Sequence, residues 1–133
     1  MSLLVFRVVM SMSINFFKIG NVWVFKHFFE DKSLFRELAD YYNRSNYRFE
    51  IRTTEDRNRV KALLESKGFE VNIVTDTSDY LVKVPKNKKY ASILKNSVEN
   101  WQQTEWRVFL MKDKVSAELA EMEGAERVTS EEN

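Results

Sequence analysis

Two aromatic-rich runs, 14–19 and 22–28, stand near the start of the chain, and the pair Gly20-Asn21 separates them. Both runs are apolar at consecutive positions, as in Phe16-Phe17 and Trp23-Val24. Glycine accepts positive φ cheaply, so this spacing predicts a tight β-hairpin. A ribbon that is apolar on both faces needs cover on two sides, from the rest of the domain or from a second copy.

The segment after the hairpin predicts a helix over 32–43, with Asp31 or Ser33 as its N-cap. Four apolar residues recur there at helical spacing and form one stripe. They are Leu34, Phe35, Leu38 and Tyr42.

The middle of the chain alternates two kinds of pattern. Residues 47–52 have a period of two, which predicts a strand with Tyr47, Phe49 and Ile51 toward the core and Arg48, Glu50 and Arg52 on the other face. Thr53 caps a helix that Gly68 ends. The remaining patterns predict two strands, 69–75 and 80–84, around a turn at 76–79. A helix over 88–102 and a strand over 104–112 follow.

This order of elements predicts an α+β fold with a ferredoxin-like β-α-β-β-α-β unit at about residues 46–113. The hairpin and first helix precede the unit, and a short helix over 115–123 follows it. The layout is similar in topology to RNA-recognition modules, but their third-strand signature is absent from 79–84, so no functional residue carries over.

Length and composition favour one domain. The chain has 133 residues, of which 44% are hydrophobic and 31% are charged, and chains of this size commonly fold as a single unit. We therefore expect a single domain over 1–133. Residues 1–13 are either an extra strand, centred on 3–9, or an extension; 124–133 form a polar, acidic tail for which we expect solvation. The first ten residues fall short of the ~20 that span a bilayer, so we expect no membrane contact.

The absence of cysteine excludes disulfides, thiolate nucleophiles and cysteine-ligated metals. It also favours a cytoplasmic location. Three widely spaced glycines leave no phosphate-binding loop, and no paired-histidine zinc spacing occurs. We therefore expect no cofactor.

The near-neutral total charge of +1 hides a division along the chain. Residues 44–114 hold fifteen Lys and Arg against ten Asp and Glu, a net of +5, whereas residues 115–133 hold one Arg against six Glu, a net of −5. The central part is therefore mildly basic and the C-terminal part acidic.

Few residues suggest catalysis or metal binding. His27, the single histidine, precedes Glu30 and Asp31 and could supply a metal ligand or a general base. Asp76 and Asp79 flank a turn and could bind a hard cation. Surface caps and ordinary turn chemistry explain both groups more simply, so we expect no metal site and no catalytic residue.

Basic residues beside aromatic ones form the remaining candidate site. Cations next to flat apolar side chains are what single-stranded RNA or another polyanion needs. On the expected sheet, these residues lie on the face away from the helices and on the turn that follows. They are Arg48, Arg52, Lys86, Lys88, Lys89, Arg107 and Phe109, with Met111 beside them.

Three functional hypotheses remain. The first is a non-catalytic, self-associating module, a homodimer built on the two-sided hairpin, that serves interaction or regulation. The second is an RNA-binding or polyanion-binding module that uses the basic face. The third is an enzyme that works with His27 and scattered carboxylates, and it ranks last.

Overall fold

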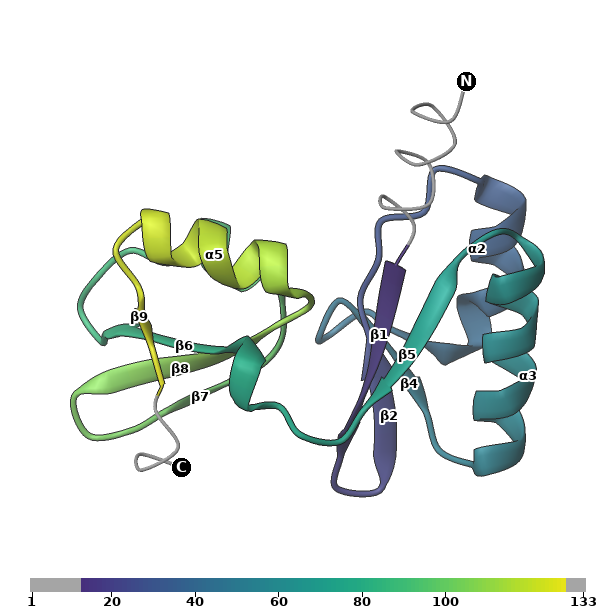
Figure 1. Cartoon of the computed structure of the whole chain (residues 1–133), viewed down its shortest axis with the longest axis horizontal. Coiled ribbons are helices and arrows are strands. Elements are labelled where there is room, and N and C mark those ends of the chain that lie inside the picture. The colour runs from purple at the N-terminus through teal and green to yellow at the C-terminus, as the bar shows by residue number, and fades with distance from the viewer. Residues whose placement is uncertain (1–12, 129–133) are drawn as a thin grey trace. The chain divides into compact units, whose positions relative to one another are not determined.

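The computed structural model describes residues 13–128, and the expected strand at 3–9 lies outside them. This part of the chain is α+β, with two sheets and four α-helices. It divides into two compact units, which we call unit 1, Met1–Thr75, and unit 2, Asp76–Asn133 (Figure 1). Whether both units unfold together as one domain stays a prediction.

Unit 1 contains a five-stranded sheet, sheet A, in the order β3-β4-β2-β1-β5. All neighbours are antiparallel except β1 and β5, which are parallel. Its elements in chain order are β1 (Ser13–Ile19), β2 (Val22–Phe25), α2 (Lys32–Leu38), the 3₁₀ turn Ala39–Tyr41, β3 (Tyr42–Asn43), β4 (Arg48–Ile51), α3 (Thr54–Ser66) and β5 (Glu70–Val74).

The predicted hairpin is confirmed. Ile19 pairs with Val22 across a two-residue turn, and Gly20 has a φ of 58° at its first position, where a tight hairpin turn favours glycine. Phe16 of β1 is buried in the core of unit 1, so cover on one side is present, and cover on the other side stays a prediction.

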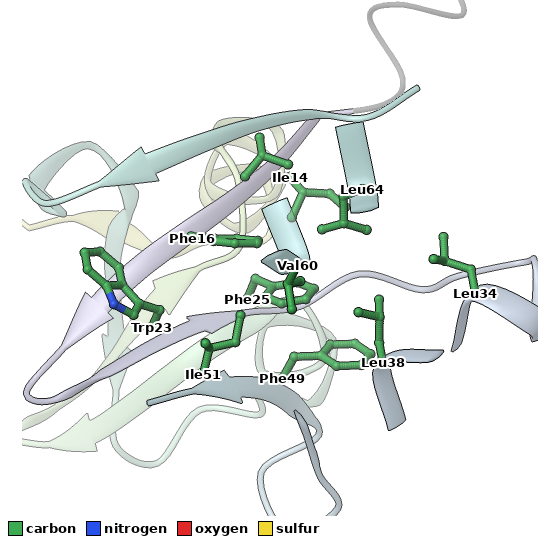
Figure 2. Close-up of a cluster of buried hydrophobic side chains, with 11 residues drawn as sticks. Ile14, Phe16, Trp23, Phe25, Leu34, Leu38, Phe49, Ile51, Val60 and Leu64 are labelled. Carbon is green, nitrogen blue, oxygen red and sulfur yellow. The ribbon is translucent and has the colours of Figure 1, made fainter. Parts of the chain in front are cut away.

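The core of unit 1 lies between one face of sheet A and the helices α2 and α3. Val60 and Leu64 of α3 point toward the aromatic side chains of the sheet (Figure 2). The expected cap is also present, because the Thr53 hydroxyl accepts a hydrogen bond from the Asp56 amide at 3.0 Å. This helix therefore begins and packs as its sequence predicts.

Unit 2 contains a four-stranded antiparallel sheet, sheet B, in the order β7-β8-β6-β9. One of its faces packs on α4 and α5. The elements are the 3₁₀ turn Ser78–Tyr80, β6 (Leu81–Pro85), α4 (Ala91–Lys95), β7 (Ser97–Gln102), β8 (Trp106–Met111), α5 (Lys114–Met122) and β9 (Glu126–Arg127).

The ferredoxin-like unit expected over 46–113 is wrong as a single sheet, because its strands divide between sheets A and B. Instead of forming a hairpin with β6, β5 runs parallel to β1, with Ile14 opposite Val71. Both of these side chains are buried in the core of unit 1. The apolar match between distant strands therefore outweighs the local turn at 76–79.

Two predicted helices are shorter than expected. The helix at 32–43 ends at Leu38, because Tyr42 pairs with Phe49 in the sheet. The helix at 88–102 ends at Lys95, and 97–102 form β7 instead. Alternating side chains in β7 pair with β8, and this pairing leaves Trp101 exposed rather than inward.

The last described residues also correct an expectation. The helix predicted at 115–123 is present as α5, but the start of the expected polar tail forms β9 and pairs with β6. Ala125 and Val128 are buried beside it, so this stretch is docked rather than solvated. Within 13–128 no helix combines the length and apolar character that crossing a bilayer requires.

Asp113 gives a direct test of this fold, because its carboxylate caps α5. One oxygen accepts from the Ser116 amide at 2.7 Å, and the other lies 2.9 Å from the Lys112 ammonium. We expect Asp113→Ala to lower the free energy of unfolding by about 1–2 kcal/mol in urea denaturation. Asp79→Ala is the matched control: its carboxylate is 72% exposed and 3.8 Å from Lys114, so we expect almost no change. Equal losses in both variants would contradict the capping role.

Candidate functional site

Unit 1 contains a cavity of about 200 Å³ that we call the aromatic hollow. It lies where the segment between β2 and α2 meets α2, the short strand β3 and the β3–β4 hairpin. Six of its eight lining residues are Phe or Tyr. The lining residues are Lys26, His27, Phe28, Phe29, Phe35, Tyr42, Tyr47 and Phe49.

Phe49 anchors the hollow to the core. Its ring stacks on Phe25 of β2 with the centroids 4.7 Å apart, and it also meets Tyr42 at 4.9 Å, Phe29 at 5.7 Å and Phe35 at 5.8 Å. Such offset and edge-to-face contacts stabilise aromatic clusters beyond the area they bury. The inner wall therefore belongs to the same aromatic cluster that packs against sheet A.

His27 is packed among rings. Its imidazole centroid lies 4.7 Å from Phe29 and 5.1 Å from Phe69, and the contact with Phe69 is edge-to-face. Of the two acidic residues that the sequence places near it, neither Glu30 nor Asp31 lines the hollow. This geometry supports a packing role for the imidazole.

Phe28 and Tyr47 are the exposed part of the hollow. Phe28 is 56% exposed and Tyr47 is 66% exposed. Tyr47 has a φ of 55°, which is uncommon for any residue other than glycine. The expectation that Tyr47 faces the core is therefore wrong, because β4 begins only at Arg48 and the preceding residue turns outward.

The Glu50 carboxylate holds the loop that carries Tyr47. One oxygen accepts a hydrogen bond from the Asn43 amide group at 3.2 Å, and the other accepts from Asn46 at 3.2 Å and from Arg48 at 2.8 Å. Arg52 approaches the first oxygen at 3.5 Å. Both ends of the β3–β4 hairpin are thus tied to one carboxylate, whose side chain is 10% exposed.

These contacts lower the pKa of Glu50 below its ordinary value of 4.5. Partial burial pulls the pKa upward, but hydrogen bonds from Arg48, Asn43 and Asn46 outweigh it. The carboxylate therefore stabilises the folded state above pH 4.5, and this contribution is lost as the pH falls through the lowered pKa.

The predicted basic face is not formed by one sheet. Arg48 and Arg52 belong to the β4 region of sheet A, whereas Arg107 belongs to β8 of sheet B. Arg48 is buried and Arg52 exposed. Arg107 donates to Asn100 at 2.7 Å and to Gln102 at 2.9 Å, and its guanidinium lies over the Tyr90 ring.

Phe109 and Met111 correct the same prediction. Both are fully buried in the core of unit 2, on the face of sheet B that α4 and α5 cover. Phe109 contacts the Tyr90 ring at 5.3 Å. It therefore cannot stack on a nucleic-acid base without opening the core.

The three predicted lysines lie between β6 and α4. All three are exposed, and the Lys88 ammonium donates to the Glu123 carbonyl oxygen at 3.0 Å. A cation at the C-terminal end of a helix offsets the partial negative charge there. Lys88 thus supports the end of α5, and RNA or polyanion binding stays a prediction.

The residues predicted as weak metal ligands do not come together, and some of their carboxylates already accept hydrogen bonds from the backbone. Asp31 caps α2 by accepting from the Ser33 and Leu34 amides, and Asp76 accepts from the Ser78 amide at 3.0 Å. The pKa of Asp31 is lowered first by a hydrogen bond from the Ser33 hydroxyl and then by the Leu34 amide, and the pKa of Asp76 is lowered by the Ser78 amide. Across residues 13–128, no three His, Asp or Glu side chains gather in a way that could hold a metal ion.

Sequence reasoning missed the aromatic hollow because four separate segments build it. Sequence patterns placed Phe35 and Tyr42 on a helix stripe and Tyr47 and Phe49 on the core face of a strand. The one signal in the sequence was an excess of aromatic residues. Phe28, Phe29 and Tyr47 supply more aromatic surface around β4 than a single small core needs.

Comparison of the chain with protein-family profiles, with curated proteins and with solved structures gave no match. The function therefore has to be inferred from the chemistry of the site itself.

The role of Glu50 can be measured through stability. We expect Glu50→Gln to lower the free energy of unfolding by about 1–3 kcal/mol at pH 7, because it leaves a buried guanidinium without its carboxylate. The difference from wild type should shrink as the pH falls from 4.5 through the lowered pKa of Glu50. Denaturant unfolding at several pH values measures this.

Glu65→Gln is the control for this experiment. Glu65 pairs with Lys61 at 2.9 Å on the surface of α3, and such pairs contribute about 0–1 kcal/mol. A Glu50→Gln variant as stable as this control, or a difference from wild type that persists unchanged in acid, would contradict the role of the carboxylate.

Proposed function

We propose that the chain is a non-catalytic interaction or regulatory module that binds its partner through the aromatic hollow. The observation that carries this proposal is a cavity walled by six aromatic rings, two of which, Phe28 and Tyr47, are more than half exposed. Binding sites concentrate exposed aromatic residues beside well-packed pockets. A cytoplasmic location, which the lack of cysteine favours, belongs to the same proposal.

The size of the hollow supports an anchor rather than a large ligand. Sites for drug-sized molecules usually enclose about 300–1,000 Å³, and an apolar cavity of about 150 Å³ can hold benzene. About 200 Å³ therefore suits one ring or one large side chain. Interfaces commonly gain much of their affinity from one such group inserted into a pocket.

The chemistry of the lining supports binding over catalysis. Apart from the tyrosine hydroxyls, the titratable groups are Lys26 and His27, and no carboxylate lines the cavity. General acid–base catalysis needs a positioned proton donor or acceptor with a group that orients it. The ring contacts of His27 with Phe29 and Phe69 support a wall rather than a reacting group.

Tyr47 supports the proposal through its backbone. A non-glycine residue in the left-handed region costs free energy and persists where the surroundings hold it in place. Here the Glu50 network closes the hairpin, and the aromatic side chain stands at the hollow. We infer that the side chain is kept for contact and not for stability.

Replacement of Tyr47 separates these roles. We expect Tyr47→Gly to leave the free energy of unfolding unchanged or to raise it by about 1 kcal/mol, because glycine adopts positive φ without strain. The same change should weaken binding of a ring to the hollow by about fivefold or more, and Tyr47→Phe should retain most of it. A Tyr47→Gly variant that unfolds much more easily than wild type would contradict this division.

Binding itself is tested with indole as a probe of one ring. In NMR titration of the full chain we expect a dissociation constant of about 1 mM, with chemical-shift changes centred on residues 26–29 and 47–49. Phe28→Ala should weaken it. Ile73→Ala is the control, since Ile73 is an exposed apolar residue on β5 that does not line the hollow. Shifts spread evenly over the surface, or none, would contradict the proposal.

The partner can be a second copy of the chain, which then supplies the ring that enters the hollow. In a two-fold dimer the same surface of both copies meets. Phe28 and Tyr47 lie at the hollow of each copy, so each copy could both offer a ring and receive one. Sedimentation at high micromolar concentration tests this form. A dimer that Phe28→Ser dissociates supports it, whereas a monomer shows that the partner is another molecule.

A further inference from the structure

We infer that the outer face of α5 binds a helical segment of another protein, one that has an apolar stripe with Lys or Arg beside it. This face belongs to unit 2, whereas the residues that line the aromatic hollow all belong to unit 1. The inference therefore goes beyond the proposed function and does not depend on it. It follows from the side chains that α5 turns outward and from the charge around them.

The outer face of α5 carries a row of apolar side chains. Val115 is 64% exposed, Leu119 50% and Met122 82%. Spacings of four and then three residues place them next to one another along one side of a helix, and we call these three residues the α5 stripe. Single exposed apolar residues are common, whereas a contiguous row with polar residues around it marks an interaction site.

The inner face of the same helix carries smaller side chains. Ala117 and Ala120 are buried in the core of unit 2, and Ser116 is buried beside them. Burial stabilises a large apolar side chain more than a small one, so a helix kept for stability alone would turn Leu119 and Met122 inward. The opposite arrangement indicates that the large side chains are kept for contact with another molecule.

Acidic residues flank the α5 stripe. By helical rotation Glu118 and Glu121 lie on one side of it and Glu123 lies on the other, at the end of the helix, and all three are exposed. Residues 115–128 hold four Glu against one Arg, a net charge of −3. The surroundings of the stripe are therefore negative.

Contacts within the chain offset this charge only in part. Glu121 pairs with Arg127 at 2.7 Å, so its charge is matched. Glu123 accepts from the Ser92 hydroxyl at 2.8 Å, but that donor is neutral and leaves the negative charge in place. Glu118 has no ion pair or hydrogen bond with another side chain among residues 13–128. Two of the three flanking carboxylates therefore keep their charge for a partner.

Two cations near α5 lie at its ends and have contacts of their own. The Lys114 ammonium, at the first residue of the helix, is 3.8 Å from the Asp79 carboxylate. The Lys88 ammonium donates to the carbonyl oxygen of Glu123 at 3.0 Å. Along the middle of the stripe, the charged neighbours that α5 itself supplies are Glu118 and Glu123.

These charges favour a basic helix as the occupant. A second copy that packs about a two-fold axis at the middle of the stripe would bring Glu118 of both copies together, and an anionic lipid surface would repel the same carboxylates. A helix with Lys or Arg beside its apolar stripe meets opposite charges instead. Its apolar side chains then pack against those of the α5 stripe, as in other complexes in which an amphipathic helix binds an apolar surface.

The length of the stripe limits the strength of the contact. From Val115 to Met122 it spans about 10 Å along the helix axis, at about 1.5 Å per residue. About two turns of a partner helix fit against it, which is less than a stable complex buries and suits a transient one. We expect a dissociation constant on the order of 100 μM.

Two synthetic helical peptides with the same leucine stripe test the inference on the full chain. One carries Lys and the other Glu at the positions beside the leucines. In NMR titrations at low salt, we expect the Lys peptide to shift the amides of 114–123 and the Glu peptide to bind at least about tenfold more weakly. Added salt should narrow this difference, because screening weakens charge pairing. Equal binding of both peptides, or no shifts in α5, would overturn the inference.

Leu119→Gln combined with Met122→Gln removes most of the stripe. Glutamine has nearly the helix propensity of leucine and methionine, and both positions are exposed, so we expect the fold to persist. The Lys peptide should bind at least about tenfold more weakly to this double variant. Ile73→Ala is the control, because it removes an exposed apolar side chain from β5 of unit 1 and should leave the affinity unchanged. Unchanged binding to the double variant would overturn the inference.

Glu118→Gln tests the charge without changing the stripe. We expect it to weaken binding of the Lys peptide about threefold at low salt and to improve binding of the Glu peptide. Glu65→Gln removes the same charge from α3 and should change neither affinity. If the double variant alters the amide spectrum without peptide, Glu118→Gln and the comparison of the two peptides on wild type decide.

Two further measurements identify a different occupant. If sedimentation finds a dimer that the double variant dissociates, a second copy covers the stripe and the inference is wrong. If vesicles of phosphatidylserine and phosphatidylcholine bind the wild type and not the double variant, a membrane covers it and the inference is also wrong. Indole binding at the hollow tests the proposed function alone, because no residue of α5 lines that cavity.

Discussion

A continuous stack of three phenylalanine rings connects the core of unit 1 to its surface. Phe16 on β1 stacks on Phe25 of β2 at 4.6 Å, and Phe25 stacks on Phe49 of β4 at 4.7 Å. Each ring belongs to a neighbouring strand of sheet A, so the stack also aligns the strands. Figure 2 shows the three rings among the buried side chains of this core. The outer ring, Phe49, is the inner wall of the aromatic hollow, which is why the site and the fold depend on the same contacts.

The hollow combines this wall of packed rings with a hairpin that polar contacts hold in place. Glu50 follows Phe49 directly and points to the other face of β4, where it collects Asn43, Asn46 and Arg48. The short strand β4 therefore carries the buried ring of Phe49 on one face and the hydrogen-bonded carboxylate of Glu50 on the other. The consequence is that Tyr47 is kept at the lip of the cavity in a conformation that its own backbone does not favour.

Local signals were sufficient for the elements that local chemistry determines. The turn at Gly20, the cap at Thr53 and the alternation of Phe49 and Ile51 each predict what the structure contains. Local signals failed where partners lie far apart in sequence. The pairing of β5 with β1 joins residues more than fifty positions apart, and no nearby pattern indicates it.

The candidate site was less predictable than the fold. Helical spacing placed Trp101 inward, but pairing with β8 makes the same residues a strand. Alternation placed Phe109 on an open face, but α4 and α5 cover that face. The aromatic hollow needs four segments brought together, and a single sequence read by its periodicities does not show which rings meet.

Intermolecular NOEs between the indole ring and assigned side-chain protons test the central claim most directly. The account predicts that a bound ring shows NOEs to the aromatic protons of Phe28, Tyr47 and Phe49 together, because these rings line one cavity. NOEs that instead lead to Trp101 on sheet B, or to none of these three rings, would contradict the claim that the aromatic hollow is the binding site.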